Sequence, residues 1–210
     1  MKKTGVAEAW VPDDETDQVM LGAGAKYQGS KMMAALKYVK NYRTAIDIGA
    51  HCGLWSVQLA QHFKRVECFE PLERHIECWI ANCQGNPRCG LWRIALGDTT
   101  GIVNMKIIPT QSGRSHVHPD GDVTVPINRL DAFLFPDVDL IKLDVEGYEL
   151  NVIKGAESTL IECKPVIIVE QKPGNGSRFN ESDKAALDYL KTLGWAVKEE
   201  IAGDFIMVRE

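Results

Sequence analysis

The segment Thr44-Ala-Ile-Asp-Ile-Gly-Ala-His-Cys-Gly53 decides the fold of this chain. Its first five residues are mostly aliphatic or β-branched, which predicts a short buried strand over 44–48. Gly49 and Gly53 bracket a turn, and the apolar periodicity from Leu54 to Phe63 predicts a helix. A strand, a glycine-bounded turn and a helix place backbone N–H groups beside the carboxyl end of the strand, where an open parallel sheet binds nucleotide-like ligands.

The residues of this turn favour one kind of nucleotide ligand. A dinucleotide fingerprint is Gly-x-Gly-x-x-Gly, whose second glycine lets the backbone approach a pyrophosphate, but His51 takes that place here. Asp47 suits a cationic ligand, and Glu70 ends the next expected strand, 65–70, where a carboxylate binds ribose hydroxyls. S-adenosylmethionine (SAM) combines a ribose, an amino-acid moiety and positive charge, so the pattern indicates SAM as the cofactor. The other interpretation is an α/β strand–turn–helix without a ligand.

Length and composition predict one globular α/β domain. The chain has 210 residues, of which 45% are hydrophobic and 25% charged, enough to cover a central sheet on both faces. The net charge of −5 and the lack of a Lys/Arg run disfavour nucleic acid as a partner. No membrane span or secretory leader is expected, so we predict a cytoplasmic location. Six cysteines without a Cys-x-x-Cys pair are expected to be reduced thiols, with neither a zinc site nor a disulfide framework.

The rest of the chain alternates between helical and strand patterns. Residues 1–29 are expected to form a loose arm or lid before a single domain over 30–210, and Ser30 is expected to cap a helix ending near 41. Tyr27 and Gln28, just before that helix, belong either over the cofactor or to an ordinary surface loop. Further helices are expected over 71–85, 130–135, 147–163 and 180–193, the last capped by Asn180. Strands are expected over 91–96, 101–108, 123–128, 138–147 and 164–170, with a C-terminal antiparallel hairpin over 195–201 and 204–208, and with 109–122 as a loop near the substrate.

Val138–Gly147 carries the second informative pattern. Alternation places Ile141, Leu143 and Val145 on one face of the strand and Lys142, Asp144 and Glu146 on the other. Three charges on one side of a central strand are unfavourable unless they are paired or line a cleft. Because this strand ends at the same sheet edge as Gly49 and Glu70, we expect a cleft. A structural ion-pair cluster is the other interpretation.

Several motifs together resemble one family. The chain resembles the FkbM family of class I SAM-dependent methyltransferases in Ile46-Asp-Ile-Gly-Ala-His-Cys-Gly53, Cys68-Phe-Glu-Pro71, Ala95-Leu-Gly-Asp98, Ile141-Lys-Leu-Asp-Val-Glu-Gly-Tyr-Glu149 with Lys154-Gly155, and Pro165–Glu170. The resemblance covers about 44–172. It implies an α/β, Rossmann-like, mostly parallel sheet of seven strands in the order 3-2-1-4-5-7-6, with the last strand antiparallel. Helices on both faces and a small β insertion after the third strand complete this fold, and His51 departs from the asparagine frequent in the family.

The resemblance also implies O-methylation of a hydroxyl on a sugar or small-molecule acceptor. We expect the adenine ring beside Ala95-Leu96-Gly97-Asp98, and the cofactor to contact Asp47, Gly49, Ala50, His51, Gly53, Glu70, Pro71, Ala95, Leu96 and Asp144. By hypothesis, Asp144 or Glu146 accepts the hydroxyl proton, with Glu170 and His116 as reserves and Lys142 paired with these carboxylates or with the oxygen. No metal is expected, although clustered carboxylates, or His116 with His118, are the residues that would hold one.

The function assignment does not depend on which residue is the base. Orientation supplies effective molarities of about 10⁵–10⁸ M, whereas a positioned base adds about 10²–10⁴-fold. Two other function classes stay open: a nicotinamide-dependent (NAD) oxidoreductase at the same sheet edge, and a non-catalytic binding module. His51 and Asp47 disfavour the first, and the presence of Asp47, Gly49 and Glu70 disfavours the second. The acceptor and the oligomeric state have no diagnostic motif.

Overall fold

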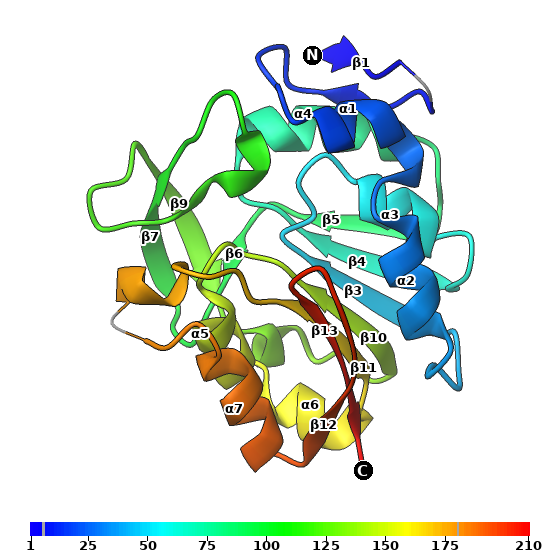
Figure 1. The fold of residues 1–210 in the computed structure, drawn as a ribbon, viewed down its shortest axis with the longest axis vertical. Helices are drawn as coiled ribbons and strands as arrows, with labels where there is room; N and C mark the ends of the chain where they lie inside the picture. The colour runs from blue at the N-terminus through cyan, green and yellow to red at the C-terminus, as the bar shows by residue number, and fades with distance from the viewer. Residues whose placement is uncertain (6, 180) are drawn as a thin grey trace.

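The computed structural model describes residues 1–5, 7–179 and 181–210, and it centres on a seven-stranded mixed sheet (Figure 1). The strand order is β12-β13-β11-β10-β3-β4-β5, which confirms the predicted 3-2-1-4-5-7-6 arrangement when read from the other edge. β13 (Asp204–Arg209) runs antiparallel to both of its neighbours. The remaining strands are β3 (Thr44–Ile48), β4 (Arg65–Phe69), β5 (Cys89–Trp92), β10 (Val138–Leu143), β11 (Val166–Glu170) and β12 (Trp195–Ile201).

Helices cover both faces of this sheet, as predicted (Figure 1). Ile46 and Ile48 of β3 point to the core under α5 (Glu149–Lys154), α6 (Glu157–Cys163) and α7 (Ala185–Thr192). Ala45 points to the core under α2 (Gly29–Leu36), α3 (Leu54–Leu59) and α4 (Glu73–Cys83). All five residues of β3 and of β11 are buried, as expected for parallel strands covered on both sides. No helix within the described residues combines the length and the apolar character needed to cross a bilayer.

A smaller sheet forms the predicted β insertion. Its four strands lie in the order β6-β9-β7-β8: β6 (Ala95–Leu96), β7 (Gly101–Lys106), β8 (His116–Val117) and β9 (Val123–Asn128). The prediction of one strand over 91–96 was wrong, because the chain passes from one sheet to the other between Trp92 and Ala95. Cys89–Trp92 belong to the main sheet, whereas Ala95 and Leu96 pair with Ile127 and Asn128 of β9 in the smaller sheet.

The predicted helix over 147–163 is two helices in the structure. A Cβ on Gly155 would lie 1.8 Å from the Gly97 carbonyl oxygen, so the chain passes close to the insertion there. Asp131 of the short 3₁₀ turn η3 (Leu130–Phe133), where a helix over 130–135 was expected, accepts the N–H groups of Ser158 and Thr159 and starts α6 anew. These contacts come from distant parts of the chain, so the helical periodicity does not reveal them.

The N-terminal helix differs from its prediction as well. α2 begins at Gly29 and ends at Leu36, and its N-cap is Gln28 in a left-handed conformation, not Ser30. The Gln28 side chain is engaged elsewhere, because its Oε1 accepts the indole N–H of Trp55 at 2.8 Å. The expected cap at Asn180 lies outside the described residues.

The segment 1–29, expected to be loose, packs onto the domain near the N-terminus, which is marked N at the top of Figure 1. It contains the two-stranded sheet of β1 (Lys2–Lys3) and β2 (Trp10–Val11), α1 (Gln18–Ala23) capped by Asp17, and the 3₁₀ turn η1 (Gly24–Lys26). Val11 and Met20 are buried in a cluster with Leu54 of α3 and Cys78 of α4. Whether the segment moves as a lid stays a prediction.

Candidate functional site

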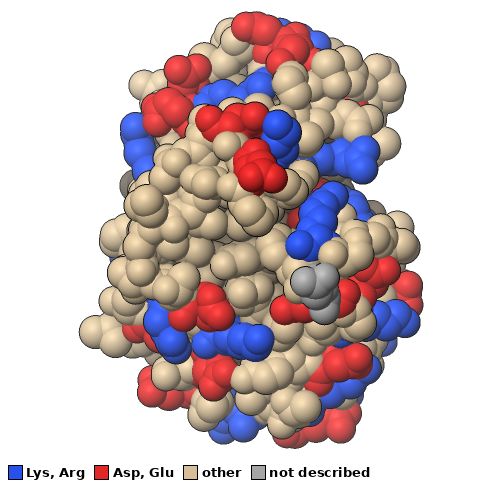
Figure 2. Space-filling view, turned by 90° about the vertical axis from the view of Figure 1, so that its left-hand side faces the viewer, with Lys and Arg blue, Asp and Glu red and all other residues tan. Residues whose placement is uncertain are grey.

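Two adjoining cavities lie along the carboxyl edge of the main sheet. The first, here the apolar cavity, is walled mainly by Phe69, Leu72, Ile94, Ala95, Leu96, Met105 and Val117, with Glu70 and His75. The second, here the polar cavity, is larger and is lined by Tyr27, Gln28, Lys31, Trp55, Arg114, Lys142, Glu170 and Lys172. Gly49, His51, Gly113, Asp144 and Glu146 line both. The insertion side, shown in Figure 2, carries uncharged residues over the left and centre of its middle, with charged side chains above, below and to the right.

The glycine turn shapes the junction between the cavities. Gly49 has a φ of 75°, and a Cβ there would lie 1.9 Å from the Asp144 carbonyl oxygen, so the position requires glycine. The N–H groups of Gly49 and Ala50 donate to the Phe69 carbonyl, and that of His51 donates to Glu70. The N–H groups of the turn at these three residues are therefore engaged by the end of β4 and by Glu70, which follows it. Gly53 lines neither cavity and packs against α4.

Asp47 is completely buried beneath the turn and lines neither cavity. Its Oδ2 accepts the Ser56 hydroxyl at 2.7 Å, and its Oδ1 lies 3.8 Å from the Lys142 ammonium. Lys142 also donates to the Gly49 carbonyl at 3.0 Å and lies 3.4 Å from Asp144. Burial lowers the pKa of Lys142, but Asp144 and Asp47 outweigh it and leave that pKa raised. Asp47 thus fixes Lys142 under the turn. The direct contact between Asp47 and the cofactor that we predicted would need an opening to Asp47, and neither cavity provides one.

Glu70 and His75 form a buried pair in the wall of the apolar cavity. Glu70 accepts the N–H groups of His51 and Leu72, each at 2.9 Å, and lies 3.2 Å from His75 Nδ1. The other ring nitrogen of His75, Nε2, is buried and has no hydrogen-bond partner within the described chain. Pro71, Ala95 and Leu96 line the same cavity, so the structure brings four predicted cofactor residues together with a histidine that the sequence reasoning missed.

Asp144, Glu146 and Glu170 converge in the polar cavity, with side-chain oxygens within 4.8 Å of one another. Lys172, which the sequence reasoning missed, places its ammonium 2.7 Å from both Glu146 and Glu170. Burial and the neighbouring Asp144 raise the pKa of Glu170 to about 9. Burial also acts to raise the pKa of Asp144, but Lys142 and Lys172 outweigh it and lower that pKa. The pKa values of the two neighbouring carboxyl groups thus move in opposite directions, so Asp144 favours the ionised form and Glu170 the protonated form.

Glu146 is held from several sides. Its backbone has a φ of 56°, a left-handed conformation that is strained for this residue type. Its carboxylate accepts from Lys172 and from Asn175 at 3.1 Å, and its carbonyl accepts from Arg178 at 2.6 Å. Glu149 caps the loop by accepting the N–H groups of Val145 and Gly147. Glu146 is thus less free than Asp144 to accept a new proton.

His116 is not brought to the junction. It lies in β8, lines neither cavity, and its Nδ1 pairs with the Arg114 carbonyl at 2.8 Å. Its ring centroid is 6.0 Å from that of His118. Within the described residues, only Asp144, Glu146 and Glu170 form a group spaced to hold a metal ion, so the two histidines have no third ligand.

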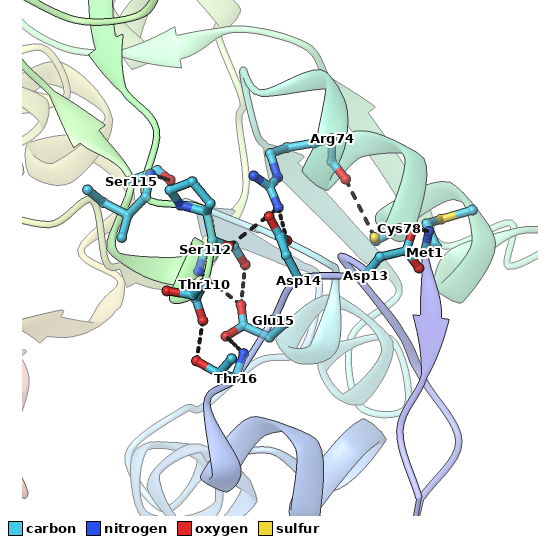
Figure 3. Close-up of polar contacts among 12 residues, drawn as sticks. Met1, Asp13, Asp14, Glu15, Thr16, Arg74, Cys78, Thr110, Ser112 and Ser115 are labelled. Carbon is cyan, nitrogen blue, oxygen red and sulfur yellow. Dashed lines mark hydrogen bonds and ion pairs between the residues drawn. The ribbon is translucent and has the colours of Figure 1, made fainter.

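A clasp joins the N-terminal segment to the insertion loop over the cavities (Figure 3). Glu15 accepts the N–H of Ser112 at 2.9 Å and the Ser112 hydroxyl, while the N–H and hydroxyl of Thr16 donate to the Thr110 carbonyl at 2.8 and 2.6 Å. Arg74 of α4 pairs with Asp14 beside them. Glu15 lines the polar cavity and Ser112 the apolar one, so two segments far apart in sequence close the site.

In a comparison with protein families, residues 47–196 match the model described as the methyltransferase FkbM domain. A search of curated proteins finds no match. Among solved structures, the methyltransferase FkbM from Methylobacillus flagellatus KT superposes with a TM-score of 0.53 at 15% identity, covering 92% of this chain and 55% of that one. The present chain thus spans just over half of that protein.

Two further solved structures are similar and were determined with ligands. The methyltransferase SMU.1697c from Streptococcus mutans, in complex with S-adenosylhomocysteine (SAH), has a TM-score of 0.53 and 13% identity, covering 85% of this chain and 94% of that one. The magnesium protoporphyrin IX methyltransferase of Synechocystis PCC 6803, with bound SAM, has a TM-score of 0.53 and 12% identity, covering 93% and 86%. At these identities the likeness shows the fold, which is that of class I methyltransferases.

Proposed function

We propose that this chain, which belongs to the FkbM family of SAM-dependent methyltransferases, methylates a hydroxyl oxygen on a sugar or another small acceptor. One observation carries the proposal: Asp144 lies in the common wall of the apolar cavity and the polar cavity, beside Lys142 and Lys172, which lower its pKa. A carboxylate at that junction is placed to take a proton between a donor bound on one side and an acceptor bound on the other. The family disfavours the two open alternatives, an NAD oxidoreductase and a binding module.

The apolar cavity suits the nucleoside part of SAM. Its walls of Phe69, Ile94 and Leu96 offer a flat aromatic base an apolar surface, and Glu70 keeps lone pairs for ribose hydroxyls. The unpartnered Nε2 of His75 beside Glu70 is a second polar atom that a hydroxyl would satisfy. Towards the junction, Asp144 and Glu146 provide the negative charge that suits a cationic donor. When bound, SAM supplies an activated methyl group on a sulfonium sulfur.

The polar cavity suits a hydroxylated acceptor. Tyr27 and Trp55 offer aromatic surface, and Lys31, Arg114 and Gln28 offer hydrogen-bond donors around the acid cluster. These residues bind and orient the acceptor, whereas Asp144 takes the hydroxyl proton as the oxygen is alkylated. Lys142 and Lys172 keep Asp144 ionised for that task. We expect the orientation of the acceptor to supply most of the acceleration, and the base about 10²–10⁴-fold.

The experiment pairs binding with transfer. Calorimetric titration should give SAH binding and no NAD binding, and a methyl-labelled donor should label members of a panel of sugar and small-molecule hydroxyl acceptors. Asp144→Asn should lower turnover on the labelled acceptor by about 10²–10⁴-fold. The control is Asp188→Asn, since this exposed carboxylate on α7 forms an ion pair with Lys191 alone among the described residues. Binding of NAD without SAH, or full turnover by the Asp144 variant, would contradict the proposal.

A further inference from the structure

A line of hydrogen bonds runs from the N-terminal segment to the glycine turn, and the first part of it is visible in Figure 3. Glu15 and Ser112 are each only 1% exposed. Ser112 contacts Glu15 through both its N–H and its hydroxyl, and its Oγ lies 2.7 Å from Nε2 of His51. His51 then donates its own N–H to Glu70. Three parts of the chain separated by 36 and 61 residues therefore meet in one buried contact series.

The direction of each hydrogen bond follows from the donors around Glu15. Its Oε1 accepts the N–H groups of Thr16 and Asp17 at 2.8 and 2.9 Å, and its Oε2 accepts the Ser112 N–H. Both oxygens therefore face donors, so the carboxylate acts as the acceptor for the Ser112 hydroxyl as well. A hydroxyl has one hydrogen, which is now used. Ser112 Oγ must accept from His51, and this assigns the proton of the imidazole to Nε2.

The other ring nitrogen of His51 is then a bare acceptor. Nδ1 has no hydrogen-bond partner within the described chain, and it is not among the fully buried unpaired atoms. Desolvation, with His75, Lys142 and Arg74 nearby, holds the pKa of His51 well below its usual value, so the ring stays neutral. The remaining polar neighbours are Cys52, whose Sγ is 3.7 Å from Nε2, and Glu70, which binds the backbone N–H.

We propose that Glu15 and Ser112 are positioning residues that hold His51 as the Nε2–H tautomer, so that Nδ1 accepts a hydrogen bond from the ammonium group of the methyl donor. The inference rests on the proposed donor site. His51 lines both cavities at the junction, beside Asp144 and Glu146, where a cation is favoured. An ammonium group has only donors, so the opposite tautomer would face it with an N–H and repel it.

The tautomer is tested first, without any ligand. Nitrogen-15 NMR of histidine-labelled protein reports which ring nitrogen carries the proton, and the spectrum of His51→Asn identifies the signals of His51 among the five histidines. We expect the Nε2–H form in the parent protein. Glu15→Gln frees the Ser112 hydroxyl to donate to Nε2 and should populate the Nδ1–H form, whereas Ser112→Ala removes the partner of Nε2. Thr16→Val, which removes only the clasp hydrogen bond to Thr110, should keep the parent signals.

Binding of SAH is tested second, by calorimetry on the matched pair His51→Asn and His51→Gln. The shorter side chain of the first variant places its amide oxygen near the position of Nδ1, whereas the longer side chain of the second places its amide near Nε2. The two variants therefore separate the roles of the two ring nitrogens. We expect His51→Asn to bind SAH within about threefold of the parent protein, and His51→Gln about tenfold or more weakly. Ser112→Ala and Glu15→Gln should weaken binding about three- to tenfold.

An SAH analogue without the α-amino group separates this contact from a general loss of structure. Against that analogue, the difference between the parent protein and His51→Gln should disappear. Gln tolerates the left-handed φ of 50° less well than Asn, and a purely structural loss would persist with the analogue. An Nδ1–H tautomer in the parent protein, equal SAH affinities of the two variants, or an unchanged difference with the analogue would overturn the inference. Failure of the parent protein to bind SAH would overturn the proposed donor site itself, a result distinguishable from the tautomer measurement.

Discussion

Glu170→Gln should change how the stability of the protein depends on pH. Glu170 is 4% exposed, and burial together with Asp144 raises its pKa to about 9, whereas the unfolded chain has a glutamate pKa near 4.3. Between these two values the folded protein holds one more proton than the unfolded chain. Since the native state binds more protons, the free energy of unfolding falls as pH rises through this window.

The size of the effect follows from the window. One proton contributes about 1.36 kcal/mol per pH unit, so from about pH 5.5 to about pH 7.5 Glu170 should remove about 2.7 kcal/mol from the free energy of unfolding. Glutamine does not titrate, so the variant should lose about 2.7 kcal/mol less than the parent over the same interval. Glu149, whose pKa is raised to about 7 chiefly by burial, contributes to both proteins and drops out of the comparison.

The assay is urea unfolding followed by tryptophan fluorescence at the two pH values, with midpoints and slopes fitted for both proteins. Trp195, the first residue of β12, is buried in the core and is one of the five tryptophans that contribute to the signal. Glu162→Gln, at an exposed position on α6, is the matched control and should follow the parent protein. Equal pH dependence in Glu170→Gln and the parent would refute the shared proton, and with it the assignment of Asp144 as the ionised member of the pair.

Three other outcomes test the site. Gly49→Ala should abolish SAH binding measured by calorimetry and destabilise the fold, because its Cβ would lie 1.9 Å from the Asp144 carbonyl oxygen. The control is Gly5→Ala, where the added Cβ has open space around it. SAH binding retained by Gly49→Ala would contradict the close approach. Glu70→Gln should weaken SAH binding by about tenfold or more, since an amide cannot satisfy both backbone N–H groups and a ribose; unchanged affinity would move the ribose elsewhere. EDTA should leave methyl transfer unchanged, because the ammonium of Lys172 already lies between Glu146 and Glu170, where a metal ion would bind. A loss of activity that Mg²⁺ restores would show that a metal ion displaces the Lys172 side chain.

The strands and helices of the main sheet could be predicted because their signals are local, whereas the order of the strands was implied by the resemblance to the FkbM family. The apolar strands around Ile46, Ile141 and Ile167 are separated by helical periods, and such alternation allows few topologies. The edge that holds the site followed from the same pattern, since the carboxyl ends of parallel strands meet at one side of the sheet. Gly49, Glu70 and Asp144 were therefore predicted to lie together, and they line the same cavity.

Contacts between distant segments could not be predicted in this way. Lys172 contacts Glu146, which lies 26 residues before it, and so joins the end of β11 to the loop after β10. His116 carries a functional residue type, but the pairing of β8 with β7 keeps it outside the cavities. The break between α5 and α6 likewise depends on the approach of Gly97 to Gly155.

The amino-acid sequence by itself determined the fold class, the family and the sheet edge at which the donor is expected, because periodicity, glycine positions and strand-end acids are short-range properties. The tertiary structure decided in which direction the pKa of each of those acids moves and which nitrogen of His51 is bare. Protonation and tautomer depend on burial and on hydrogen-bond partners. Ser112 and Glu15 are 61 and 36 residues from His51 along the chain. Only in the folded protein does Ser112 contact His51, and Glu15 contact Ser112.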